Sequence, residues 1–336
     1  IIWAVVFGGW RMRRWFVVFV AAGAVCVAFA QQKANRRALH RQARQLLRQE
    51  KYEEALEVYR RILQLDANDR TALYNAACCQ SRLGRVDEAL SLLRRAVKAG
   101  FFNPYHMERD PDLENIRKEK EKWDAFMKEF EELEKEAAQK KTEALKKHLE
   151  GWLLRQDEER KLVLFTDAGE EWADRLMEIL KAWYDAHTGY YFPNKPRFHI
   201  FVCVAKDGAS YRSKLGGRAG AAGFYSHATR TLNLNLRTGT GTLVHEFTHA
   251  LHYADMDARG QRHPIWIVEG FGTMFEQCTI KDGKPLGLVN WRLPIIQRAI
   301  RAGKYIPLAD FIKKSPRYFA ANTSLAYAEA RYIFFW

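Results

Sequence analysis

The sequence predicts a chain of two parts, an all-α array of paired helices followed by an α+β domain. Three observations carry this prediction. Segments in the first third of the chain repeat at an interval of 34 residues, and each one reads as two amphipathic helices. Beyond residue 160, short apolar or alternating runs typical of strands are interspersed with longer helical patterns. The 336 residues are enough for two domains of roughly 150 residues each.

The composition excludes several classes of protein. Hydrophobic residues at 48% and charged residues at 28% are typical of a folded chain rather than a disordered one. The 5 cysteines include no CxxC pair, which argues against a disulfide-rich mini-protein or a zinc ribbon. The net charge is +14, but no Arg-rich arm or basic–aromatic stripe appears. We therefore predict no nucleic-acid partner and interpret the excess charge as a solvated surface.

The first thirty residues have the pattern of a secretory signal peptide. Arg11, Arg13 and Arg14 precede an uncharged, largely apolar run of 16 residues that ends in Ala28-Phe29-Ala30. Ala28 and Ala30 are the small residues expected at positions −3 and −1 of a cleavage site, which predicts cleavage after Ala30. The alternative is an uncleaved N-terminal anchor, and only in that case is a membrane a predicted partner. Either interpretation predicts an exported protein that is periplasmic, extracellular or anchored facing outward.

Residues 31–130 carry the helical repeat. A shift of 34 residues places Ala55 on Ala89 and Leu56 on Leu90. The predicted helices are 38–50, 52–65, 72–83 and 86–99. Small residues at the crossing point of paired helices, together with this period, resemble the tetratricopeptide repeat. The resemblance implies a groove that binds a peptide or protein partner.

The remainder of the chain is predicted to be a charged helical connector at 131–160 and an α+β domain at 161–336. The predicted strands are Lys161–Thr166, Arg197–Ala205, Gly223–Ser226 and Thr231–Leu236, with an amphipathic helix near 170–187 between the first two. The last two strands alternate in polarity and are predicted to lie at the edge of the sheet.

The candidate chemistry lies in His245-Glu246-Phe247-Thr248-His249. Positions i and i+4 of a helix share one face, so His245 and His249 can bind the same metal ion. Glu246 projects beside that ion and can take a proton from a water molecule there. Apolar neighbours on both sides of the motif predict a helix buried inside a domain.

Glu269 is the predicted third metal ligand. It lies 20 positions after His249 in Trp266-Ile-Val-Glu-Gly270, on a second predicted helix, Ile265–Gln277. Two histidines and one carboxylate leave a fourth position open, which is the catalytic arrangement of zinc. We therefore predict one Zn²⁺ ion.

HExxH followed at this distance by WxxEG resembles the gluzincin metallopeptidases, and more closely the bacterial peptidase-MA-like domains found behind tetratricopeptide repeats. The resemblance implies a zincin-like fold with a mixed or antiparallel sheet and a catalytic tyrosine that stabilises the oxyanion. Tyr327, 58 positions after Glu269, fits that role best, and Tyr332 is second. Because the chain ends within an apolar helix, we expect the domain to be incomplete at its C-terminus.

One position departs from the family pattern. Some gluzincins carry an acid four residues after the ligand glutamate, where it orients a zinc-bound histidine. Thr273 occupies that position here. Asp255, Asp257 and Glu276 are the candidates for a substitute.

The resemblance also implies that a substrate peptide pairs with the predicted edge strand at Asn233–Asn235.

These patterns predict a zinc-dependent peptidase that acts on a peptide or protein substrate, with Glu246 as general base. The lack of a GxMEN-like sequence favours an endopeptidase. The alternative is a non-catalytic interaction scaffold in which the repeats bind a partner and the zinc domain is degenerate or structural.

Overall fold

The computed structural model describes residues 31, 34–101, 103–217 and 222–335, so the predicted signal peptide or anchor at 1–30 lies outside the described residues. The described residues form two compact units. The repeat unit contains the residues up to 101 together with 110–129, and the sheet unit contains 103–109 and 130–335. Within the part of the chain that is described, none of the helices is long and apolar enough to cross a membrane.

The repeat unit is a series of antiparallel helices. A helix at 34–48 is followed by α2 (Tyr52–Leu65), α3 (Arg70–Arg82) and α4 (Val86–Lys98), and then by the short helices η1 (Pro111–Leu113) and α6 (Glu114–Lys118). Ala55 and Ala89 are completely buried, as expected for small residues where paired helices cross. Two predicted helical hairpins are therefore present, with ends within a few residues of the predicted ones.

The sheet unit is built on a mixed sheet of five strands in the order β1-β2-β3-β5-β4. The strands are β1 (Leu153–Asp157), β2 (Leu162–Thr166), β3 (Ile200–Ala205), β5 (Thr231–Asn235) and β4 (Gly223–Ser226). The three central strands are parallel to one another, while β1 and β4 pair antiparallel at the two edges. Strands β2 and β3 are buried along their whole length, as is typical of parallel strands covered on both faces.

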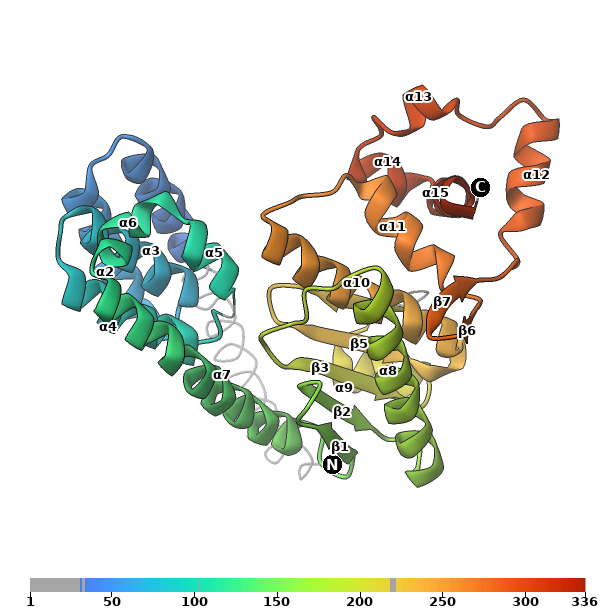
Figure 1. Ribbon diagram of the computed structural model, residues 1–336, viewed down its shortest axis with the longest axis horizontal. Coiled ribbons are helices and arrows are strands. Elements are labelled where there is room, and N and C mark those ends of the chain that lie inside the picture. Colours follow the sequence, from blue (N-terminus) through green and yellow to red (C-terminus); the bar gives the residue numbers. More distant parts are fainter. Residues whose placement is uncertain (1–30, 32–33, 102, 218–221, 336) are drawn as a thin grey trace, which may run out of the picture. The chain divides into compact units, whose positions relative to one another are not determined.

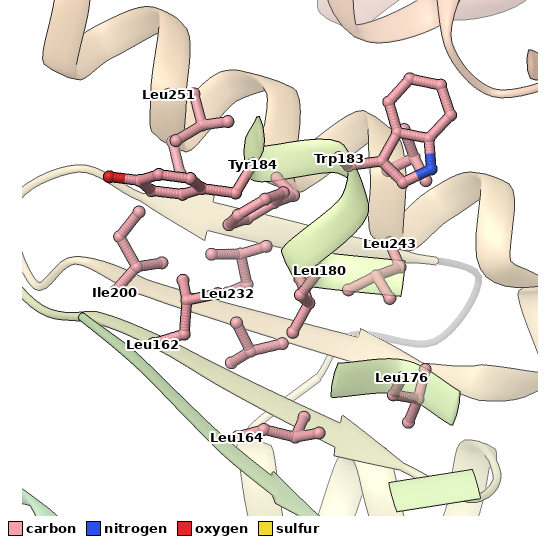
Figure 2. Close-up of a cluster of buried hydrophobic side chains, with 14 of the residues drawn as sticks. Leu162, Leu164, Leu176, Leu180, Trp183, Tyr184, Ile200, Leu232, Leu243 and Leu251 are labelled. Carbon is pink, nitrogen blue, oxygen red and sulfur yellow. The ribbon is translucent and has the colours of Figure 1, made fainter. Parts of the chain in front are cut away.

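Helices α8 (Glu170–Tyr190) and α10 (Thr240–Arg259) cover one face of this sheet. Figure 2 shows the side chains of Leu176 and Leu180 from α8 pointing toward those of β2, β3 and β5, with Leu243 and Leu251 of α10 beside them. Leu180 is completely buried. This core holds α10, and with it the HExxH motif, against a rigid sheet.

The second face of the sheet is covered by α7 (Lys120–His148) and α9 (Gly208–Leu215). Glu134 of α7 is fully buried and accepts hydrogen bonds from the backbone N–H of His199 at 2.7 Å and from its Nδ1 at 2.9 Å. Lys141 donates to the carbonyl of Thr229 at 2.6 Å. Residues 131–160 were predicted to be a connector, but they instead form part of the sheet unit, and β1 within them is an edge strand (Figure 1).

The edge of the sheet next to α10 differs from the prediction. β5 lies between β3 and β4, so its backbone is paired on both sides and Asn233–Asn235 cannot accept a further strand. The open edge belongs to β4. Strand order depends on pairing between distant segments, which local alternation does not encode.

Residues 265–335, about a fifth of the chain, form helices and one hairpin. They comprise α11 (Ile265–Met274), the hairpin β6 (Cys278–Lys281) and β7 (Lys284–Gly287), and helices α12 (Leu293–Arg301), α13 (Leu308–Phe311), α14 (Pro316–Ala321) and α15 (Thr323–Phe335). Figure 1 places α15 alongside α11. The completely buried Arg331 of α15 donates to the carbonyls of Thr273 and Leu288. This side chain ties the end of α11 to the segment after β7.

One buried histidine gives the sheet unit a pH dependence. His187 of α8 is completely buried against Trp183 and Phe275. Its Nε2 lies 3.1 Å from the hydroxyl of Thr248. Burial lowers the pKa of His187 to about 3.

We predict that His187→Gln makes stability less sensitive to acid. Below pH 6.5 the unfolded chain binds a proton at this histidine and the folded chain does not, so folding is progressively disfavoured as pH falls. Between pH 6 and 5 the slope of unfolding free energy against pH should be shallower in the variant by about 1 kcal/mol per pH unit. Urea unfolding followed by tryptophan fluorescence measures the free energy of unfolding at each pH. Equal slopes in wild type and variant would contradict the lowered pKa of His187.

Candidate metal centre

Helix α10 presents two histidines on one face. Leu243, Phe247 and Leu251 point into the core, which fixes the rotation of the helix. His245 and His249 lie one turn apart on the neighbouring face and are each only 7% exposed. Their Nε2 atoms are 3.0 Å apart.

Helix α11 brings Glu269 to the same point. The helix starts after Pro264 and packs across α10. The Oε2 atom of Glu269 lies 3.5 Å from Nε2 of His245 and 3.5 Å from Nε2 of His249. The three residues predicted as ligands are therefore brought together, with one donor atom from each inside a single small cluster.

A glycine makes this approach possible. A Cβ atom on Gly272 of α11 would lie 2.8 Å from Cε1 of His249 and 2.9 Å from Nε2 of His245. Separations below 3.0 Å are essentially never seen for a real Cβ atom. Any other residue at 272 would push the two imidazoles away from Glu269.

The spacing of the three donors fits a tetrahedral zinc ion. Ligand atoms bound at about 2.0–2.1 Å around such an ion are about 3.3–3.4 Å from one another, and the observed separations are 3.0, 3.5 and 3.5 Å. The Oε2 atom of Glu269 is buried and has no hydrogen-bond partner among the described residues. Two imidazoles and a carboxylate are also a donor set that zinc accepts.

The charges at the cluster favour a cation. Burial lowers the pKa of His245, but the carboxylates of Glu269 and Glu276 outweigh burial and raise that pKa to about 10. Burial raises the pKa of Glu269, but His249 and His245 hold it well below its usual range. The site thus stabilises positive charge, which a divalent ion can supply in place of a proton.

The donors open into a cleft of about 590 Å³. Glu246 lines this cleft beside His245, His249 and Glu269, as do residues of strand β4. Tyr253 and Arg292, which the motifs did not single out, also reach it.

Tyr327 of α15 lies in the same cleft. Its ring is 6.4 Å from that of His245, centre to centre, and is nearly parallel to it. Burial raises the pKa of Tyr327 well above its usual range, and the carboxylates of Glu269 and Glu246 add to the effect. The hydroxyl therefore keeps its proton at neutral pH and is available as a donor. Tyr332, the second candidate, is buried against Phe335 and does not line the cleft.

Of the three carboxylates considered as substitutes for an acid at 273, the structure places one beside a histidine of the cluster. Glu276 lies with Oε1 3.3 Å from Nδ1 of His245. Asp255 pairs with Arg259 and with the amide of Asn194, and Asp257 pairs with His227. Burial raises the pKa of Glu276, but the hydrogen bonds from Arg292 and the nearby His245 lower it to about 2, so this carboxylate is charged at neutral pH.

One comparison with known protein families matches the helical part of the chain. Residues 46–107 match the model of the tetratricopeptide repeat family. A chloroplastic protein of Arabidopsis thaliana is 39% identical over 105 residues, which are 30% of this chain and 31% of that protein. The chain thus covers about a third of that relative's length. The family match confirms the predicted repeats, and it ends before the sheet and the HExxH helix.

The geometry predicts a zinc site that depends on His249. Full-length protein incubated with zinc and passed through a desalting column should retain one ion per chain, and His249→Ala should retain essentially none, because two donors cannot complete the cluster. Metal content is measured by atomic emission. His263→Ala, a histidine outside the cluster, serves as the control and should match wild type. Equal zinc in wild type and His249→Ala would contradict the site.

Proposed function

We propose that this protein is a zinc-dependent metallohydrolase, and specifically a peptidase. The single observation that supports the proposal most strongly is the convergence of His245, His249 and Glu269 on one point, with Glu246 facing the same cleft. Three protein ligands leave a coordination position open, which distinguishes catalytic zinc from structural zinc. A purely structural site would not need an acid such as Glu246 next to it.

In this proposal Glu246 moves the proton. Bound zinc would polarise the scissile carbonyl and make water a stronger nucleophile. The carboxylate of Glu246 takes a proton from the attacking water as the C–O bond forms. It then gives that proton to the amide nitrogen as the C–N bond breaks, so that the products are a carboxylic acid and an amine, which exchange a proton to become a carboxylate and an ammonium group. The hydroxyl of Tyr327 donates a hydrogen bond to the oxygen on which negative charge develops.

The cleft suits an extended peptide. Among the described residues, strand β4 (Gly223–Ser226) pairs only with β5, and Gly223, Phe224 and Tyr225 line the cleft. An extended substrate can pair with the other edge of β4 as an additional strand. Binding through the main chain at this edge suits an internal segment of a longer chain, in keeping with the proposed endopeptidase activity. The proposed place of action is outside the cytoplasm, on the basis of the pattern in residues 11–30.

A second function has its own support. Residues 46–107 match the tetratricopeptide repeat family, and such repeats commonly bind other proteins. The repeat unit has a cleft of about 530 Å³ lined by Leu56, Leu63 and Leu92 between α2, α3 and α4. We propose that this surface binds a protein partner. If binding is the only function, the wild-type protein will leave every peptide of a diverse synthetic library intact in the presence of zinc.

We predict that Glu246→Gln separates metal binding from catalysis. The variant keeps all three ligands but lacks the base, so it should bind zinc like wild type and cleave peptides at least about 100-fold more slowly. Cleavage is followed by mass spectrometry of a synthetic peptide library. Wild-type rates in purified Glu246→Gln protein would refute the mechanism.

Tyr327→Phe is expected to reduce the rate rather than binding. Loss of one donor to the oxyanion typically lowers kcat about 100- to 1,000-fold, while KM and zinc content should change little. The two kinetic constants are measured on the best peptide from the library. A change confined to KM would assign Tyr327 to substrate binding instead.

A further inference from the structure

Histidines that bind a metal usually have their second ring nitrogen held by a carboxylate or carbonyl, which fixes the ring and raises its basicity. In this chain the two histidines differ in that respect. Nδ1 of His245 lies 3.3 Å from Oε1 of Glu276, an ion-pair distance, whereas Nδ1 of His249 has no ion-pair or hydrogen-bond partner among the described residues. Thr273, four residues after Glu269, instead donates its hydroxyl to the carbonyl of Glu269 at 2.7 Å.

Arg292 holds Glu276 in place. Its Nε donates to Oε2 and its NH2 group donates to Oε1 of Glu276, each at 2.6 Å. This two-pronged pairing fixes the plane of the carboxylate as well as its position. The side chains are 7% exposed for Arg292 and 15% for Glu276, so water competes little with the pair.

The backbone around Glu276 is held as closely as its side chain. A Cβ atom on Gly241, four residues before His245 on α10, would lie 2.1 Å from the carbonyl oxygen of Glu276. Only glycine at 241 allows the chain to pass there. Arg331 donates to the carbonyls of Thr273 and Leu288 on either side. The position of Glu276 beside His245 is thus fixed by Arg292, by the close approach of Gly241 and by the hydrogen bonds of Arg331.

We propose that Glu276, fixed by Arg292, is the positioning residue that orients His245 for metal binding, in place of an acid at 273. This inference rests on the proposed metal site. It assigns a role to the loop between β7 and α12, which carries Arg292 and which none of the motifs marked. Arg292 acts on His245 through Glu276. Its guanidinium also lies over the ring of Tyr327, 5.3 Å from the ring centre, so the test measures zinc binding and not catalysis.

Zinc affinity of the full-length protein tests the proposal, measured by competition with a chromogenic chelator. Glu276→Gln keeps the shape of the side chain and removes its charge, and it should weaken zinc binding about 10- to 100-fold. Arg292→Gln leaves the carboxylate charged but releases it, and it should also weaken binding. Asp255→Asn is the matched control, because Asp255 is a buried carboxylate of the same unit that also pairs with an arginine. It should bind zinc as tightly as wild type.

The Arg292 variant separates orientation from charge. If Glu276 acted only through its negative charge, removing the neighbouring arginine would strengthen zinc binding, and tighter binding by Arg292→Gln would overturn the proposal. Unchanged affinity in Glu276→Gln would overturn it as well. Arg292→Lys, which can restore one of the two hydrogen bonds, should bind zinc with intermediate affinity.

A spectroscopic readout distinguishes this role from a general loss of stability. The visible absorption bands of the cobalt-loaded protein report ligand geometry, and they should shift in Glu276→Gln and Arg292→Gln but not in Asp255→Asn. Identical spectra in all four proteins would contradict a positioning role. Failure of the proposed metal site gives a different result, because the wild-type protein would then bind neither zinc nor cobalt; failure of the proposed peptidase activity would appear only as the absence of peptide cleavage.

Discussion

The candidate metal centre depends on the close approach of two helices. Helix α10 is fixed by its packing on the sheet, and α11 must come near enough for Glu269 to reach both histidines. A side chain at Gly272 would fill the space that the imidazoles occupy. The same constraint applies at Gly241, where α10 meets the backbone of Glu276. Two glycines therefore set the distances on which the candidate chemistry depends.

The arrangement concentrates buried charge, and the fold compensates for it. Glu246, Glu269 and Glu276 bring three carboxylates to one cleft. Arg292 pairs with one of them, Glu276. Buried carboxylates without partners are costly, so such a cluster persists where a cation offsets the charge. Without a metal ion, protonated His245 supplies the positive charge that offsets these carboxylates, because its pKa is raised to about 10. The cluster therefore favours positive charge, which in our proposal a divalent ion supplies in place of the proton.

Local patterns were sufficient to predict that the three candidate donors converge, because helix periodicity fixes which residues share a face. His245 and His249 follow from a spacing of four, and Glu269 follows from a short second helix. The DG dipeptide at Asp282 was a readable signal for the β6–β7 hairpin that the sequence analysis did not use. Strand order was not readable, so both Gly223–Ser226 and Thr231–Leu236 were expected at the edge and the substrate was placed on Asn233–Asn235, whereas β4 alone of these two strands ends the sheet. Arg292 was missed because its role depends on contacts between distant segments.

The central claim is that two imidazoles and one carboxylate hold a zinc ion with a position left open. X-ray absorption at the zinc edge of the zinc-loaded, full-length protein tests it most directly. The account predicts nitrogen and oxygen neighbours at about 2.0–2.1 Å, with outer-shell scattering from two imidazole rings. A sulfur neighbour at about 2.3 Å, or a shell of oxygen atoms without imidazole scattering, would contradict it.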